Sequence, residues 1–200
     1  MKDALLIYNA HLVDKTRDSH KGAVLVESGK ISSFPKSEDV SAMLKEGTVP
    51  CFNAEGKVLM PSFIDMHAHF RDPGLTHKED IASGSRAAVA GGFGTVVLMP
   101  NTNPVISSDK AAKENCRKAK ELGLSNIIQS VSITKGFDGK TIAHLENLTA
   151  NEVPLITEDG KEVANSAVML SAMKIAAKKG IIVSCHCEDP ALAEEARPFR

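Results

Sequence analysis

The sequence of 200 residues is 42% hydrophobic and 24% charged, a composition typical of a chain that folds around an apolar core. Its formal net charge of −1 excludes a general electrostatic attraction to nucleic acid or to an anionic membrane, so a small molecule is the expected partner. The sequence has no apolar run long enough for a signal peptide or a membrane span, which predicts a cytoplasmic protein.

Residues 1–57 alternate short apolar runs with turn signals. The segments 4–14 and 22–34 are predicted to be strands because β-branched and other apolar residues are concentrated between turn-forming residues. At Val58 the pattern changes to a repeated alternation of strand and helix, which predicts a domain boundary near residue 57. We therefore expect a small β-sandwich-like domain over residues 1–57 and a second domain over residues 58–200.

The second domain is predicted to contain five strands separated by helical segments. The predicted strands are 58–69, 94–100, 125–134, 152–159 and 181–189. A weak helix is predicted at 142–149, a strong one at 166–179 with Met169, Met173 and Ala176 facing inward, and residues 190–200 are predicted to begin another helix. Strands that alternate with helices pair in parallel, which leaves a doubly wound sheet or a (β/α)₈ barrel. Five such units are too few to close a barrel.

Polar residues that can bind a metal ion or an anion lie at the carboxyl ends of four of the five predicted strands. They are His67 and His69, Asn101, Asp159, and His186. In both candidate folds the carboxyl ends of the strands form the ligand-binding edge. Imidazole and carboxylate groups suit Zn²⁺ and related divalent ions, so this set predicts a metal site. Arg71 shares a face with His67 and His69 if the first strand continues that far.

These residues also have purely structural interpretations. The two histidines at the first strand end can be solvated or hydrogen-bonded imidazoles, and Asp159 before Gly160 is, taken alone, more typical of a turn. Cys185 and Cys187 flank His186 but alternate with it along the strand, so we expect both thiols to be small core residues. Four further histidines lack a ligand-like sequence context and are expected at surface or loop positions: His11, His20, His77 and His144.

Four longer motifs contain these candidate residues or lie between them: DMHAHFRDPG at 65–74, GSRAAVAGGFGTVVLMPNTNP at 84–104, EDG at 158–160 and HCED at 186–189. Together they resemble the dihydroorotases of the amidohydrolase superfamily. The HxHFRDPG and PNTNP motifs are more similar to those of dihydroorotases than to those of hydantoinases or allantoinases. The resemblance implies a (β/α)₈ barrel of amidohydrolase type, of which this sequence holds about the first five βα units.

The resemblance also implies a role for each candidate residue. His67 and His69 would bind one zinc ion, His186 would bind a second, and Asp159 would bridge the two. Arg71 and Asn101 would bind the carboxylate of the substrate, a task suited to a guanidinium group. The expected reaction interconverts dihydroorotate and N-carbamoyl-aspartate in pyrimidine biosynthesis, and metal-activated water is the nucleophile.

Dihydroorotases also use a histidine ligand from the sixth barrel strand and a proton-transferring aspartate from the eighth. We therefore expect the general acid/base to lie beyond Arg200 and the 200-residue segment to be an incomplete N-terminal portion. Two alternatives remain open from the sequence alone. One is a catalytically incomplete homologue that acts as a scaffold or partner subunit, and the other is a related cyclic amidase such as an allantoinase. A homo-oligomer is compatible with each function.

Overall fold

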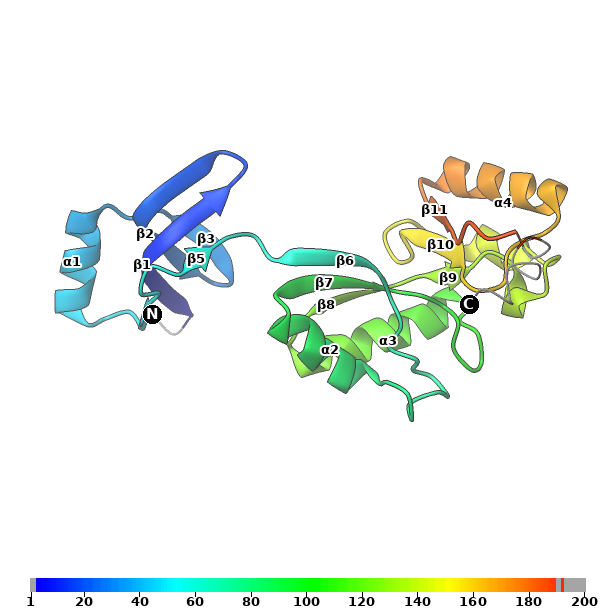
Figure 1. Cartoon of the computed structure of the whole chain (residues 1–200), viewed down its shortest axis with the longest axis horizontal. Helices are drawn as coiled ribbons and strands as arrows, with labels where there is room; N and C mark the ends of the chain where they lie inside the picture. The colour runs from blue at the N-terminus through cyan, green and yellow to red at the C-terminus, as the bar shows by residue number, and fades with distance from the viewer. Residues whose placement is uncertain (1–2, 190–191, 193–200) are drawn as a thin grey trace. The chain divides into compact units, whose positions relative to one another are not determined.

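The computed structural model describes residues 3–189 and Leu192. The chain divides into two compact units, residues 1–61 and 62–200 (Figure 1). Among the described residues, no helix combines the length and apolar character that crossing a membrane would require. The helix predicted to begin after residue 189 lies outside the described residues apart from Leu192.

The first unit is a five-stranded mixed sheet with one helix beside it. Its elements are β1 (Ala4–Asp14), β2 (Arg17–Glu27), β3 (Lys30–Ser33), α1 (Ser37–Glu46), β4 (Cys51–Asn53) and β5 (Val58–Leu59). Strand β1 pairs antiparallel with β2 and parallel with β4 and β5, so it is the central strand. Leu6, Ala10 and Leu12 alternate along β1 and are buried. The described residues of this unit form one sheet, and the second layer of a sandwich stays a prediction.

The second unit contains two three-stranded parallel sheets. Their strands are β6 (Phe63–Ala68), β7 (Phe93–Leu98) and β8 (Asn126–Gln129) in one sheet, and β9 (Val131–Ser132), β10 (Leu155–Glu158) and β11 (Ile182–Cys185) in the other. Both the N–H and the hydroxyl of Ser130 donate to the carbonyl of Leu98, at 3.1 and 2.5 Å. At this point the predicted strand 125–134 leaves β7 and pairs with β10 instead. The described residues therefore form a parallel α/β arrangement, and the five consecutive units of a (β/α)₈ barrel stay a prediction.

Three α-helices connect these strands. They are α2 (Ile81–Ala90), α3 (Asp109–Leu122) and α4 (Ser166–Lys179). In Figure 1, α2 and α3 cover one face of the β6-β7-β8 sheet, and α4 lies against the sheet that contains β10 and β11. Side chains of Asp80, Ser108 and Asn165 accept hydrogen bonds from the first-turn N–H groups, which fixes where the helices begin. Gly123 and Gly180 end α3 and α4 in the left-handed conformation.

The structure corrects three details of the sequence analysis. The weak helix predicted at 142–149 is a short 3₁₀ turn over Ala143–Asn147, because Asn and Thr at its end disfavour a longer helix. In helix α4, Ala176 is buried and Met169 packs against the core, as predicted, whereas Met173 is 48% exposed and Ala172 is buried instead. Cys185 and Cys187 are exposed and not core residues, because β11 pairs with β10 alone among the described strands.

Candidate active site

The carboxylate of Asp159 lies among three histidines and one asparagine. Asp159 follows β10 directly and is only 8% exposed. Its Oδ1 atom lies 3.2 Å from Nε2 of His67 and 3.3 Å from Nδ1 of His186. Its Oδ2 atom lies 3.5 Å from Nε2 of His69 and accepts a hydrogen bond of 2.7 Å from Nδ2 of Asn101. The structure thus gathers all five residues that the sequence places at strand ends.

Parallel pairing explains this convergence. His67 lies near the end of β6, Asn101 follows β7, Asp159 follows β10 and His186 follows β11. Parallel strands have their carboxyl ends at the same edge of a sheet, so residues that follow them meet there. The first and last of these strands belong to different sheets, yet their histidines reach the same oxygen atom of Asp159.

Asn101 determines which nitrogen of His69 carries the proton. Because the Asp159 carboxylate can only accept, the amide nitrogen of Asn101 faces Asp159 and its Oδ1 faces His69. Nδ1 of His69 lies 2.9 Å from that amide oxygen and must donate to it. The Nε2 atom of a neutral His69 therefore keeps its lone pair and points toward Asp159. This is the tautomer that a metal-binding histidine requires.

Arg71 lies beside Asn101 in a loop held by close backbone packing. Its guanidinium donates to Oδ1 of Asn101 at 3.3 Å, and its backbone has a φ of +59°. A Cβ atom on Gly74 would lie 1.7 Å from the carbonyl oxygen of Asn103, so only glycine fits there. The N–H of Asn103 also donates to the carbonyl of Pro73 at 3.0 Å. These contacts join the loop that carries Arg71 to the loop that carries Asn101.

Polar side chains of α3 hold the loop that carries Arg71 in place. Asn115 is 2% exposed, and its Nδ2 donates to the carbonyl of Asp72 at 2.7 Å and to Oε1 of Gln129 at 2.9 Å. The ammonium group of Lys118 pairs with the carboxylate of Asp72 at 3.0 Å. Side chains from α3 therefore hold the residue next to Arg71 at both its backbone and its carboxylate.

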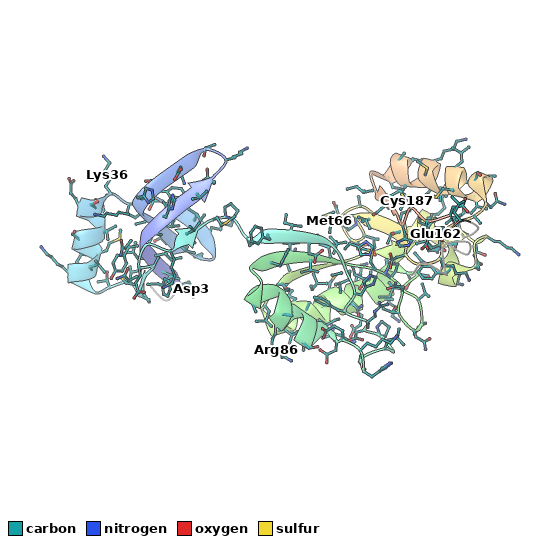
Figure 2. All side chains as sticks on the ribbon, viewed as in Figure 1. Asp3, Lys36, Met66, Arg86, Glu162 and Cys187 are labelled. Atoms are coloured by element: carbon teal, nitrogen blue, oxygen red, sulfur yellow. The ribbon has the colours of Figure 1, made fainter. Side chains whose placement is uncertain are left out.

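Two carboxylates near His186 were missed in the sequence analysis. Nε2 of His186 lies 2.9 Å from Oε2 of Glu188 and 3.6 Å from Oε1 of Glu162. The hydrogen bond to Glu188 raises the pKa of His186, and the charges of Asp159 and Glu162 act in the same direction. Figure 2 shows Glu162 close to the segment that carries Cys187. Both glutamates come shortly after the carboxyl end of a strand, and that position could have identified them as candidate site residues.

Donor atoms suited to a metal ion form two adjacent groups. His67, His69 and Asp159 each offer an atom within 4.8 Å of the others. Glu162, His186 and Glu188 form the second group under the same limit. Asp159 connects the two groups through its contact with His186. Imidazole nitrogen and carboxylate oxygen are common zinc ligands, so the donor set fits one or two such ions.

Comparison with known proteins gives sequence relatives along nearly the whole chain. A family described as Dihydro-orotase-like matches residues 56–197. A dihydroorotase from Clostridium botulinum is 46% identical over 187 residues, which cover 93% of this chain and 45% of the relative. A dihydroorotase from Aquifex aeolicus is 40% identical over 190 residues, which cover 94% of this chain and 44% of the relative. The chain thus spans less than half the length of these relatives.

Solved structures with the same fold are more distant in sequence. An L-hydantoinase (dihydropyrimidinase) from Arthrobacter aurescens superposes with a TM-score of 0.80 at 18% identity, over 98% of this chain and 43% of that one. A D-hydantoinase (dihydropyrimidinase) from Thermus sp. superposes with a TM-score of 0.69 at 23% identity, over 98% and 42% of the two chains. At these identities the likeness shows a shared fold.

Proposed function

The chain belongs to the dihydro-orotase-like family, and we propose that it supplies the metal-binding part of an amidohydrolase that interconverts dihydroorotate and N-carbamoyl-aspartate. One observation carries the proposal: the nearly buried carboxylate of Asp159 lies within 3.5 Å of His67, His69 and His186. A turn-forming aspartate needs no such surroundings. The reaction belongs to pyrimidine biosynthesis, and its substrates are small anions.

The residues around Asp159 are proposed to hold two zinc ions. His67 and His69 would bind one ion, His186 would bind the other, and Asp159 would be a ligand shared by both. Bound zinc would polarise the amide carbonyl of the substrate and lower the pKa of a water molecule. Asn101 supports this assignment because it holds His69 in the tautomer whose Nε2 lone pair points toward Asp159.

Arg71 and Asn101 are proposed to bind the substrate carboxylate. Arg71 uses only one terminal nitrogen for its contacts with Asn101 in the described residues, so the rest of its planar donor fork is available. Asn101 donates one amide hydrogen to Asp159 and has a second hydrogen to offer. A guanidinium binds a carboxylate through two parallel hydrogen bonds, which would orient the ring toward Asp159.

We propose that further strands pair with the open edges of β6 and β11 and close a (β/α)₈ barrel. Each is an edge strand among the described residues. Phe63, Ile64 and Met66 on β6 and Ile182 on β11 are between 50% and 61% exposed. Open edges with exposed apolar side chains are costly for a soluble protein, and further strands would cover them. The general acid/base and another metal ligand would come from that remainder of the barrel.

Turnover by the natural gene product tests the proposal. We expect zinc-dependent interconversion of dihydroorotate and N-carbamoyl-aspartate, loss of activity on chelation, and recovery when Zn²⁺ is restored. Turnover of allantoin in place of dihydroorotate would identify an allantoinase. A zinc-loaded protein that turns over neither compound would overturn the enzymatic proposal and favour a scaffold or partner subunit.

A further inference from the structure

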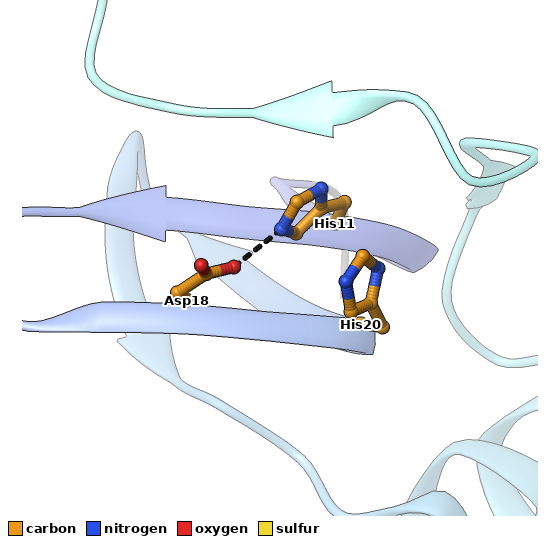
Figure 3. Close-up of side chains that lie close together, drawn as sticks. All are labelled: His11, Asp18 and His20. Atoms are coloured by element: carbon orange, nitrogen blue, oxygen red, sulfur yellow. Dashed lines mark hydrogen bonds and ion pairs between the residues drawn. The ribbon is translucent and has the colours of Figure 1, made fainter.

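A second group of metal-binding side chains lies in the first unit, on the hairpin formed by β1 and β2. His11 comes from β1, and Asp18 and His20 come from β2 (Figure 3). Their donor atoms all lie within 4.8 Å of one another. The cluster shares no residue with the site around Asp159, and nothing in the proposed reaction uses it.

The register of the hairpin brings these residues together. In the antiparallel ladder Leu12 pairs with Ser19 and Ala10 with Gly22, so His11 lies opposite the segment 20–21. Asp18 and His20 are two residues apart in β2 and share a face. The pairing shifts register between Ala10 and Leu12, the interval that contains His11, and such bulges redirect side chains. Leu12 points into the core, so the cluster lies on the outer face of the hairpin.

The contacts within the cluster are closer than an ordinary ion pair would need. Nε2 of His11 lies 2.5 Å from Oδ1 of Asp18. The rings of His11 and His20 are stacked, with centroids 3.9 Å apart and planes inclined by 27°. Within the described part of the chain, the ring of His20 has no hydrogen-bond partner. A salt bridge between His11 and Asp18 therefore leaves the second imidazole unexplained, whereas a shared cation would use all three groups.

We propose that His11, Asp18 and His20 bind one divalent transition-metal ion of the zinc class. Two neutral imidazoles and one carboxylate form a donor set that suits such ions. Zinc lies about 2.0–2.2 Å from nitrogen and oxygen ligands, so the donor atoms must move toward a common centre. The side chain of Asp18 is 78% exposed, so its carboxylate has room to move toward such a centre. A bound ion would clamp β1 to β2 and stabilise the folded hairpin by mass action.

Isothermal titration with Zn²⁺ tests this inference without relying on the proposed function. The titration uses a chain that carries His67→Ala, His69→Ala and His186→Ala, which removes the three histidine ligands proposed for the other site. We expect one zinc ion to bind this chain and His20→Ala to weaken the binding by about tenfold or more, since even indirect ligand support is worth about 10–100-fold. His77→Ala removes another exposed histidine outside every cluster and is the matched control, with unchanged affinity expected.

Absence of zinc binding in the parent chain, or equal affinity with and without His20, would overturn the inference. If these three substitutions prevent folding, substoichiometric Cu²⁺ added to the otherwise unaltered chain gives a second measurement. Paramagnetic broadening of the amide signals of Ser19 and Gly22 that disappears in His20→Ala would support the site. Broadening that is absent, or that is retained in His20→Ala, would contradict it.

Discussion

The Nδ1 atom of His69 lies 2.9 Å from the Oδ1 atom of Asn101, while Nδ2 of the same asparagine lies 2.7 Å from the carboxylate of Asp159. One amide thus holds both a candidate metal ligand and the carboxylate at the centre of the site. A residue that supports a ligand from behind fixes its orientation and raises its basicity. Asn101 is therefore expected to affect metal binding as well as substrate binding.

Replacement of Asn101 by alanine should weaken zinc binding by about 10–100-fold, because His69 loses the acceptor that fixes its tautomer. Competition with a chelator of known affinity measures the effect. Asn151→Ala is the control, since Asn151 is exposed and lies outside the cluster. Equal zinc affinity in Asn101→Ala and the unaltered protein would show that Asn101 serves only as a packing or substrate-binding residue.

Arg71→Lys should leave zinc content unchanged and weaken the binding of dihydroorotate. A guanidinium does not bind divalent cations, and an ammonium group cannot reproduce its planar two-point contact with a carboxylate. The expected loss is about 1.5–3 kcal/mol, the contribution of a hydrogen bond to a charged group. KM for dihydroorotate and zinc per protein, measured on the same sample, check this prediction. Loss of zinc in Arg71→Lys would contradict a role directed at the substrate.

Gly74→Ala should disturb the loop that carries Arg71. The added Cβ would meet the carbonyl oxygen of Asn103 at 1.7 Å, and the backbone φ of +82° disfavours any other residue. We expect a loss of unfolding free energy larger than the about 1–2 kcal/mol of left-handed strain alone, together with weaker substrate binding. Gly123→Ala is the matched control, since its φ is +62° and its Cβ would meet nothing within 4 Å. Equal losses in urea unfolding of the two variants would show that the contact with Asn103 has no energetic effect.

Local sequence patterns were sufficient to predict individual elements. Strand β1 and helix α4 coincide with the predicted segments 4–14 and 166–179, because apolar residues between turn signals indicate the strand and apolar periodicity indicates the helix. The candidate site residues could be grouped because each lies at or just after the carboxyl end of a strand in a parallel series. Their assigned roles rest on the family resemblance and stay proposals.

Features that depend on packing between distant segments could not be predicted. The division of the third strand at Ser130 results from hydrogen bonds to Leu98 of the neighbouring strand. The contact between His11 and His20 depends on the register of the hairpin, so both were expected to be unremarkable surface residues. Helix α1 was not anticipated, because it is short and buries no residue. The spacing of residues along the sequence predicts neither the pairing register of two strands nor which distant segments contact each other.

The stability of the fold should decrease as the pH falls below about 6.5, in part through His144. Its Nε2 donates to the carbonyl of Ser132 at 2.9 Å, and Nδ1 is buried without a partner among the described residues. Burial lowers the pKa of His144 from its model-peptide value of 6.5, so the unfolded chain takes up this proton at a higher pH than the folded one. The contribution of neutral His144 to the free energy of unfolding is complete above pH 6.5 and is lost as the pH falls toward the lowered pKa of His144 in the folded protein.

His144→Gln retains a donor to Ser132 but cannot be protonated, so it should reduce this pH dependence. Urea unfolding at pH 7.5 and pH 5.5 provides the measurement, with the other histidines common to both proteins. We expect the unaltered protein to lose more unfolding free energy between the two pH values than His144→Gln does. The same loss in both proteins would exclude His144 as a source of the pH dependence.

Zinc content of the Asp159→Asn variant tests the central claim most directly, with the natural gene product as the protein in which the substitution is made. Asn can form the same turn with Gly160 and can accept the hydrogen bond from Asn101, so the fold should survive with a nearly unchanged thermal midpoint. If Asp159 binds zinc together with His67, His69 and His186, loss of its charge should lower zinc per protein and reduce turnover by about 100-fold or more. Full zinc occupancy with near-normal turnover would contradict the account and leave Asp159 as a turn residue.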